Sequence, residues 1–314
     1  TSLRQQVTNL REHHVAEENG SLTFRGLHRA SGREVEVRVL GAKTYEERRA
    51  IRNEVEVLEQ CGGGDILTLF GAASAVDSTR ISFPIAPKGV SDANVAFLFY
   101  EPFSYDLNEV LSATYSGRIG RKTELRLTVE ILRGLRKLEK AGFMHRDVRP
   151  ENIMIVGDCF SAPGCHAKIG GFCNSCTASA LRRGDEPEFV GDPMYIAPEV
   201  WKGKTRHRKA DVWAAGLVAY DLFVGGLPNE LMTAAIGGSH ENLREHPLRE
   251  YVPRQFDISN DARFQEFMLE DWEVATLIQS MLTRTAFFRP SVKKALARAS
   301  KLAESRSIDV PEQK

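Results

Sequence analysis

The spacing of apolar residues along the chain changes from strand-like to helical near residue 101. Val35, Val37 and Val39 alternate with charged residues, which predicts the second strand of a hairpin that turns near Ser31-Gly32. Short apolar runs predict further strands at residues 66–70, 95–100 and 153–155. Helical spacing predicts helices over residues 2–14, 45–60, 107–111, 124–140, 212–223, 271–282 and 292–302. This order predicts an α+β fold of two lobes, one built on strands and one on helices.

The same pattern sets the boundaries of the predicted parts: a helical extension over residues 1–18, a small strand-rich lobe over 19–101 and a large helical lobe over 102–314. The chain has 42 basic and 42 acidic residues, so its formal net charge is zero, which argues against a nucleic-acid partner bound through its phosphates. No apolar run reaches the roughly 18 residues of a transmembrane segment.

One polar stretch, between the helix predicted at 124–140 and the strand predicted at 153–155, carries candidate chemistry. His145-Arg146-Asp147 is followed, five residues after the Asp, by Asn152, and this stretch resembles the catalytic loop of the protein kinase family. In that family the Asp, here Asp147, orients the hydroxyl to be phosphorylated, and the Asn, here Asn152, helps to hold a metal that bridges the phosphates. The resemblance implies the bilobal protein kinase fold.

Further signatures in the family's order extend the resemblance over about residues 20–300. They imply a stack of side chains between the lobes, anchored by Asp211 and formed by Leu58, Leu69, His145 and Phe172. They also imply a pair between Glu199 and Arg289. In the family Arg146 holds a phosphate on the activation segment. Here that anion is expected on Ser175, Thr177 or Ser179, or is supplied instead by Glu186 or Glu188.

The positions that touch ATP in the family depart from its pattern. Gly171 stands where the family has its metal-binding Asp, and no glycine-rich loop precedes the strand at 35–40. Arg38 replaces the nucleotide-binding Lys and is expected to pair with Glu54. Glu36 replaces the small Ala that packs on adenine, where a buried carboxylate is costly. The predicted remodelled cleft consists of Glu36, Arg38, Glu54 and Met154.

These departures predict a pseudokinase that is not an enzyme and binds neither a nucleotide cofactor nor a metal, with Asp147, Asn152 and Gly171 as degenerate motif positions. The predicted role is a scaffold or an allosteric protein-interaction module. Two alternatives stay open: a weak, atypical Ser/Thr kinase that uses Asp147, and a sensor of another ligand in the remodelled cleft. The long insertion at 77–94 is the first expected partner site, and the sequence predicts no oligomeric state.

Four cysteines crowd into a short stretch: Cys159, Cys165, Cys173 and Cys176. The Pro/Gly-containing segment between Cys159 and Cys165 is typical of a bridged hairpin, so disulfides and secretion are predicted, with a zinc site or free thiols as alternatives. Clustered cysteines and the missing glycine loop are similar to secreted apicomplexan rhoptry kinases and their with-no-Gly-loop branch, which includes a bradyzoite-stage pseudokinase of the cyst wall. That resemblance implies a vacuolar or cyst-wall setting.

Overall fold

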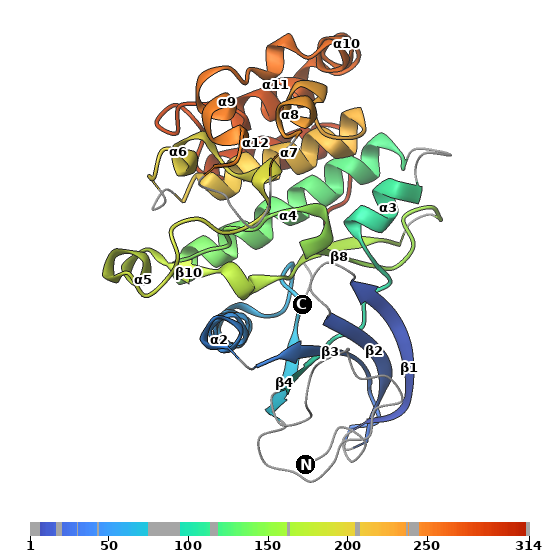
Figure 1. Cartoon of the computed structure of the whole chain (residues 1–314). Helices are drawn as coiled ribbons and strands as arrows, with labels where there is room; N and C mark the ends of the chain where they lie inside the picture. The colour runs from blue at the N-terminus through green and yellow to red at the C-terminus, as the bar shows by residue number, and fades with distance from the viewer. Residues whose placement is uncertain are drawn as a thin grey trace.

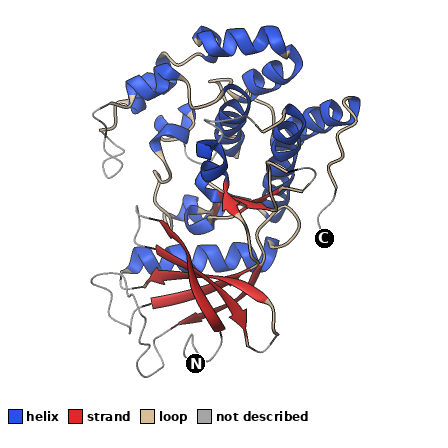
Figure 2. Ribbon diagram, turned by 90° about the vertical axis from the view of Figure 1, so that its right-hand side faces the viewer, coloured by secondary structure: helices blue, strands red, loops and turns tan. Residues whose placement is uncertain are grey.

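The chain folds into the two predicted lobes, one built on a sheet and one on helices (Figure 1, Figure 2). The computed structural model describes residues 7–16, 21–29, 31–42, 44–74, 95–113, 119–161, 164–204, 208–236, 238 and 245–311. The insertion predicted at 77–94 and residues 17–20 lie outside the described residues. The α+β fold class is therefore confirmed, while the expected partner site at 77–94 stays a prediction.

One antiparallel sheet of five strands, in the order β1-β2-β3-β5-β4, forms the smaller lobe. Its strands are β1 (Val7–Ala16), β2 (Ser21–His28), β3 (Glu34–Gly41), β4 (Leu69–Ser74) and β5 (Val95–Tyr100). Helix α2 (Tyr45–Cys61) follows β3. It begins in a capping box, because the Thr44 side chain accepts from Glu47 N at 3.1 Å and Thr44 N donates to Glu47 Oε2 at 2.8 Å.

The helix predicted over residues 2–14 is wrong where the structure describes it, because residues 7–16 are strand β1. β1 pairs with β2 along its length, with irregularities between Thr8 and Arg11 and between Glu12 and His14. An isolated helix of this length is marginal in water, whereas an edge strand gains a complete ladder of hydrogen bonds from its neighbour. The pairing of β1 with β2 thus outweighs the helical spacing of apolar residues in this segment.

Helices dominate the larger lobe, which also contains two small sheets. The helices are α3 (Leu107–Ala113), α4 (Arg121–Ala141), α5 (Ala178–Arg183), α6 (Pro198–Trp201), α7 (Ala210–Val224), α8 (Asn229–Ala234), α9 (Leu248–Arg254), α10 (Ala262–Glu270), α11 (Trp272–Met281) and α12 (Val292–Ser305). The 3-10 turns are η5 (Pro150–Asn152), η6 (Phe172–Asn174), η7 (Pro193–Tyr195) and η8 (Ile258–Asn260). The strands are β6 (Tyr105–Asp106), β7 (Phe143–Met144), β8 (Ile153–Val156), β9 (His166–Ile169) and β10 (Cys176–Thr177).

Helix α7 forms the centre of this lobe. Its apolar residues occur all round the helix, which is the pattern of a helix enclosed by others. It contacts α4, α10 and α11, and α12 covers another face of α4. Arg289, which lies just before α12, is completely buried against the ring of Trp213, 5.1 Å from its centroid. The predicted pair is confirmed: Arg289 donates to both carboxylate oxygens of Glu199, at 2.6 and 2.8 Å.

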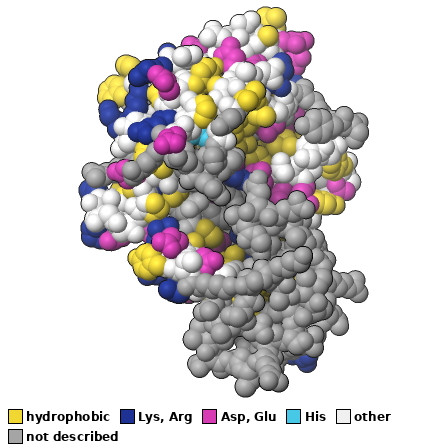
Figure 3. Space-filling view, viewed as in Figure 1, with side chains coloured by type: hydrophobic (Ala, Val, Ile, Leu, Met, Phe, Trp, Pro, Cys, Tyr) yellow, Lys and Arg dark blue, Asp and Glu magenta, His cyan; other side chains and the backbone are white. Residues whose placement is uncertain are grey.

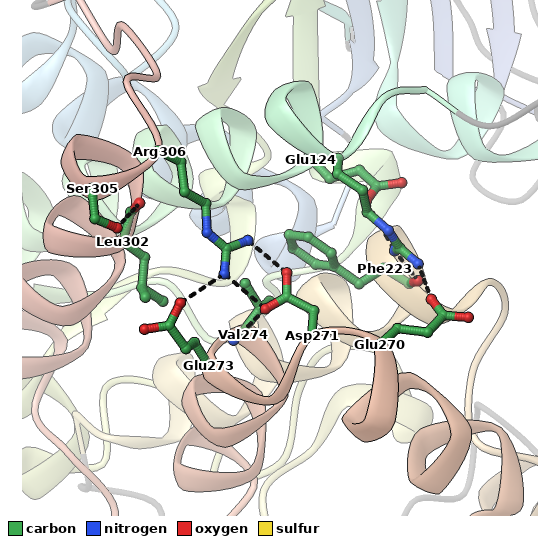
Figure 4. A network of polar contacts seen from close by, with 10 residues as sticks. Glu124, Phe223, Glu270, Asp271, Glu273, Val274, Leu302, Ser305 and Arg306 are labelled. Atoms are coloured by element: carbon green, nitrogen blue, oxygen red, sulfur yellow. Dashed lines mark hydrogen bonds and ion pairs between the residues drawn. The ribbon is translucent and has the colours of Figure 1, made fainter.

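Charged side chains of both signs lie among hydrophobic and other side chains on the face of the helical lobe that Figure 3 shows. At the junction of α11 and α12, the guanidinium of Arg306 donates to Asp271 at 2.6 and 2.8 Å and to Glu273 at 3.1 Å (Figure 4). Burial acts to raise the pKa of Asp271, but the Arg306 contacts outweigh it and lower this pKa. Within the described ranges, no helix is long and apolar enough to cross a membrane.

We expect Arg289→Met to lower the free energy of unfolding by about 3–5 kcal/mol, because the change leaves Glu199 as an uncompensated buried charge. Urea denaturation measures the loss. The double variant Glu199→Leu/Arg289→Met removes both charges and is expected to recover most of the stability. An equal loss in the single and double variants would contradict this explanation.

Candidate active site

The catalytic-type loop is held in place by one buried carboxylate. Asp211, at the start of α7, accepts the backbone N–H groups of His145 and Arg146, each at 2.9 Å. Arg146 has a φ of 70°, a conformation that costs a non-glycine residue free energy unless its surroundings fix it. Burial raises the pKa of Asp211, although His145 and the backbone donors oppose the shift. Asp211 therefore fixes the strained turn from which Asp147 projects.

The predicted stack between the lobes is present. The rings of His145 and Phe172 are tilted at 52° with centroids 5.0 Å apart, and both side chains are fully buried. Leu58 of α2 is buried in the same core, and Leu69 of β4 packs against it. His145 Nε2 also lies 2.9 Å from the carbonyl oxygen of Gly170. These contacts tie the catalytic-type loop to α2 and to the segment that begins at Gly171.

Asp147 is oriented by three N–H donors. Its Oδ2 accepts from Asn152 Nδ2 at 3.1 Å and from Asn174 Nδ2 at 3.2 Å, and its Oδ1 accepts from the backbone of Asp192 at 3.2 Å. Asn152 also donates to the backbone carbonyl of Asp147 at 2.8 Å. The two predicted motif residues are thus brought together, and Asn174 is a third contributor that sequence reasoning missed.

Arg149 is a cation of the loop that interacts electrostatically with Asp147. It lies 2.9 Å from Glu151 Oε2 through Nε and 2.9 Å from Asp192 Oδ2 through Nη1. Burial acts to lower the pKa of its guanidinium, but Glu151, Asp192 and Asp147 outweigh it and raise this pKa. The catalytic-type loop and the activation segment are therefore joined by an ion pair at the same place where Asp192 donates to Asp147.

The space of the family's metal-binding carboxylate is filled by Asn152. Gly171 adopts φ 71° and ψ 48°, which is the left-handed region. A Cβ built on Gly171 would meet Asn152 Oδ1 at 2.1 Å and Asn152 Cγ at 2.3 Å. An Asp at position 171 is thus excluded in this conformation, by its backbone and by its neighbour. Gly171 has no side chain, so it cannot provide the carboxylate ligand that the family has at this position.

The replacement for the nucleotide-binding Lys lies in a buried polar cluster. Tyr100 of β5 donates to Glu54 Oε1 at 3.1 Å, and the Cys173 thiol donates to Glu54 Oε2 at 3.6 Å. Burial acts to lower the pKa of Arg38, but Cys173, Tyr100 and Glu54 outweigh it and raise this pKa. Burial also raises the pKa of the Cys173 thiol to about 12, so the thiol stays protonated. Arg38 and Glu54 thus share a cluster that also contains Tyr100 and Cys173, two members absent from the prediction.

Glu36 is compensated by a residue that the sequence analysis did not single out. Its side chain is fully buried, and its Oε2 accepts from Arg25 Nε at 3.0 Å. Arg25 and Glu36 are opposite each other on β2 and β3, and Arg25 also donates to the carbonyl oxygen of Phe103, in the connector after β5. The signal was available, because opposite charges at paired positions of the predicted hairpin favour a cross-strand contact. Met154 of β8, the fourth residue of the remodelled cleft, lies beside Gly170, where an added Cβ would meet its Cε at 3.5 Å.

Backbone carbonyl groups, and not the expected anionic side chain or phosphate, accept the hydrogen bonds of Arg146. Arg146 donates to the carbonyl oxygens of Pro187 and Glu188, the latter at 3.1 Å. The Glu186 carboxylate instead accepts from Asn53 at 3.3 Å and lies 3.3 Å from Arg49 Nε, both on α2. The expectation that the carboxylate of Glu186 or Glu188 binds Arg146 is therefore wrong. Glu186 instead binds α2 and so ties the activation segment to that helix. Ser175 is buried and donates to the His145 carbonyl at 3.1 Å.

Of the four clustered cysteines, two form a disulfide and two are free thiols. Cys159 and Cys165 form a disulfide, as the hairpin interpretation predicted. Cys173 and Cys176 are free thiols, so the prediction that all four are bridged is wrong for this pair. Both are held elsewhere, Cys173 against Glu54 and Cys176 with its sulfur 3.4 Å from Arg146 Nη1. Because Cys159 and Cys165 are bonded to each other, the four cysteines do not form a zinc site.

Residues 14–299 match the protein kinase domain, so the chain belongs to this family. It is 27% identical over 207 residues to serine/threonine-protein kinase dkf-2 of Caenorhabditis briggsae, which covers 65% of this chain and 16% of that protein. It is 25% identical over 247 residues to serine/threonine-protein kinase D3 of Mus musculus, a match that covers 76% of this chain and 25% of that protein. It is 26% identical over 211 residues to serine/threonine-protein kinase D2 of Rattus norvegicus, a match that covers 66% of this chain and 21% of that protein. The chain spans about a quarter or less of the length of these relatives.

These relatives overturn the prediction that the chain is not an enzyme. They are named serine/threonine-protein kinases, so the comparisons support membership of a family of enzymes. The prediction rested on Gly171, Glu36, Arg38 and the missing glycine loop. Those changes alter how a nucleotide is contacted, but they leave in place Asp147, the group that orients an acceptor hydroxyl.

The donor side of the cleft does not fit a magnesium nucleotide bound in the family's usual way. Mg²⁺ is commonly held through carboxylate oxygens, and Gly171 provides none while Asn152 fills the space beside it. The Arg25–Glu36 pair lies where the family packs adenine. The β1–β2 connection at residues 17–20, where the glycine-rich loop belongs, contains a single glycine. No reaction step below is therefore assigned to a magnesium nucleotide in that position.

We expect Gly171→Ala to lower the free energy of unfolding by about 2 kcal/mol or more, because the left-handed backbone and the overlap with Asn152 both oppose a Cβ. Chemical denaturation measures the loss. Gly184→Ala is the matched control, since Gly184 has φ 80° with no atom within 4 Å of an added Cβ. It is expected to lose about 1 kcal/mol. Adding Asn152→Ala is expected to relieve part of the Gly171→Ala loss, and equal losses at the two glycines would contradict the overlap.

Proposed function

We propose that the chain is an atypical serine/threonine protein kinase domain, with an intact acceptor side and a remodelled donor side. The observation that carries the proposal is the arrangement of Asp147, which Asn152, Asn174 and Asp192 hold through three N–H groups. A carboxylate with fixed orientation beside a cation is the arrangement that positions an acceptor hydroxyl in the family. The names of the relatives support the same reaction class.

Asp147 has the geometry to act on an acceptor hydroxyl. A carboxylate has about four lone-pair sites, and the side chains of Asn152 and Asn174 both donate to Oδ2. Oδ1 accepts one backbone N–H, which leaves it as the oxygen with room for a further donor among the described residues. In this proposal Oδ1 accepts a hydrogen bond from the hydroxyl of a Ser or Thr and so orients that acceptor hydroxyl.

The test is transfer of labelled phosphate from ATP, with Mg²⁺ or Mn²⁺, to the chain itself and to a Ser/Thr peptide mixture. Asp147→Asn is expected to lower the rate by about 100-fold or more, because a positioned general base contributes on this scale. Asp309→Asn, at an exposed position, serves as the control and is expected to change nothing. Label incorporation that is the same in the wild type and in Asp147→Asn would overturn the proposal.

A second candidate is an allosteric or scaffolding role in binding another protein, and the fixed activation segment favours it. Arg146 binds the carbonyl oxygens of Pro187 and Glu188, and Glu186 binds α2. The surface of this segment is therefore set by the chain's own contacts, without a phosphate. Partner binding that survives Asp147→Asn would support this role, and binding that requires Asp147 would argue against it.

We propose that the chain resides in an oxidising compartment, as a secreted protein. The Cys159–Cys165 disulfide supports this proposal, because such bonds persist mainly outside the cytosol. The narrower likeness to secreted apicomplexan kinases, with a vacuole or cyst wall as its setting, belongs to the same proposal and rests on the same cysteines.

Thiol titration of the denatured, unreduced protein is expected to find three free thiols, those of Cys61, Cys173 and Cys176. Reduction is expected to raise the count to all five cysteines of the chain. The variant Cys159→Ser/Cys165→Ser should give the same count with and without reductant. Five free thiols in unreduced protein isolated under alkylating conditions would contradict the disulfide and remove the support for secretion.

A further inference from the structure

A groove outside the candidate active site follows α11, with α12 on one side at its smaller end and Asp257-Ile258 beside its larger end. It consists of two concavities, of about 390 Å³ and about 320 Å³, that share Thr276. We call it the α11–α12 groove and define it by Trp272, Thr276, Arg284, Arg298, Lys301 and Leu302. Helix α11, which the groove follows, has 10 residues and is therefore about 15 Å long, the length of about five residues of extended chain.

One end of the groove carries an apolar anchor site. Trp272 is 66% exposed although its ring is large, and it lines the smaller concavity together with Leu302. Figure 4 shows this end of the groove, where Leu302 and Ser305 of α12 lie near Glu273 of α11. A large exposed aromatic side chain beside a concavity is typical of a protein-binding site.

The rest of the groove is positively charged. The chain has no acidic residue between Glu273 and Glu304, a stretch that contains Arg284, Arg298 and Lys301 of the groove. On α12 the cations at Lys294, Arg298 and Lys301 follow i, i+4, i+7 spacing, so they share one exposed face. A positive groove favours an anionic occupant, since complementary charge steers association and suppresses other partners.

The acidic residues that line the groove are already bound within the chain. Glu273 accepts from Arg306 at 3.1 Å, and Asp257 accepts from the Ser259 backbone and hydroxyl at 3.1 and 2.7 Å. Of the cations, Arg298 reaches only the Ser280 hydroxyl, at 3.0 Å, and Lys301 has no ion-pair partner among the described residues. Three cations of the groove thus face two lining acids, so the net charge of the lining is positive.

We propose that the α11–α12 groove binds an acidic segment of a partner protein, with an apolar side chain of that segment anchored between Trp272 and Leu302. The groove is concave and about one short peptide long, which favours an extended peptide over a flat membrane surface. This inference does not depend on phosphoryl transfer, because the groove lies on α11 and α12 and shares no lining residue with the cluster around Asp147.

Fluorescence anisotropy with a labelled peptide of Asp and Glu around a central Leu-Phe pair tests the proposal. We expect saturable binding that weakens about tenfold or more in Trp272→Ala and in Arg298→Glu/Lys301→Glu, as truncation of an anchor does. The matched controls are Leu269→Ala, which removes an exposed apolar side chain outside the groove, and Lys122→Glu/Lys202→Glu, which makes the same charge change on exposed lysines elsewhere. Circular dichroism establishes that each variant is folded.

Two control probes separate the alternatives. A peptide with Asn and Gln in place of every acid, and one with Ala in place of the Leu-Phe pair, are each expected to bind at least about tenfold more weakly. Equal binding of the neutral peptide, or equal losses in the control variants, would overturn the proposal. Trp272-dependent binding to vesicles rich in phosphatidylserine, with no binding of the acidic peptide, would also overturn it and assign the groove to a membrane. Failure of phosphoryl transfer would leave these outcomes unchanged.

Discussion

The conformation of the candidate site depends on Asp211. A single carboxylate, buried at the start of α7, accepts two successive backbone N–H groups and so fixes Arg146 at a φ of 70°. Burying a charge is costly unless it is hydrogen-bonded, and the two donors with His145 nearby provide that compensation. The turn then places His145 against Phe172 and Asp147 against Asn152. The most central helix of the large lobe therefore sets the geometry of a loop that faces the smaller lobe.

Contacts between protein groups and contacts to a nucleotide differ in how far this chain keeps the pattern of the family. Contacts between protein groups are retained, among them the bidentate pair of Arg289 with Glu199 and the stack of His145 on Phe172. Contacts that a nucleotide would make are replaced by contacts within the chain, since Arg25 compensates Glu36 and Asn152 fills the space beside Gly171. The first replacement gives the buried Glu36 carboxylate a charged partner, and the second occupies space with a side chain that also donates to Asp147.

Much of this was predictable, because the fold and the motif positions depend on local spacing. The strand over 95–100, the helix over 45–60 and the Glu199–Arg289 pair were predicted from sequence and a family resemblance. Strand β1 was missed, because its stability comes from pairing with β2 and not from its own apolar pattern. Tyr100 and Asn174 were also missed, since each acts on a residue distant in sequence, whereas Arg25 was missed although the hairpin pattern could have placed it opposite Glu36. The enzyme prediction failed because absent nucleotide contacts say nothing about the acceptor side.

Backbone carbonyl groups of the activation segment bind Arg146. Arg146 has positive charge to satisfy, and the carbonyl oxygens of Pro187 and Glu188 provide partial negative charges that are always present. Glu186 then links the segment to α2 through Arg49 and Asn53, and α2 carries Glu54 into the cluster with Tyr100 and Cys173. A chain of contacts thus runs from the catalytic-type loop through the segment to the smaller lobe. Every link in this series of contacts is made by the protein's own side chains and backbone.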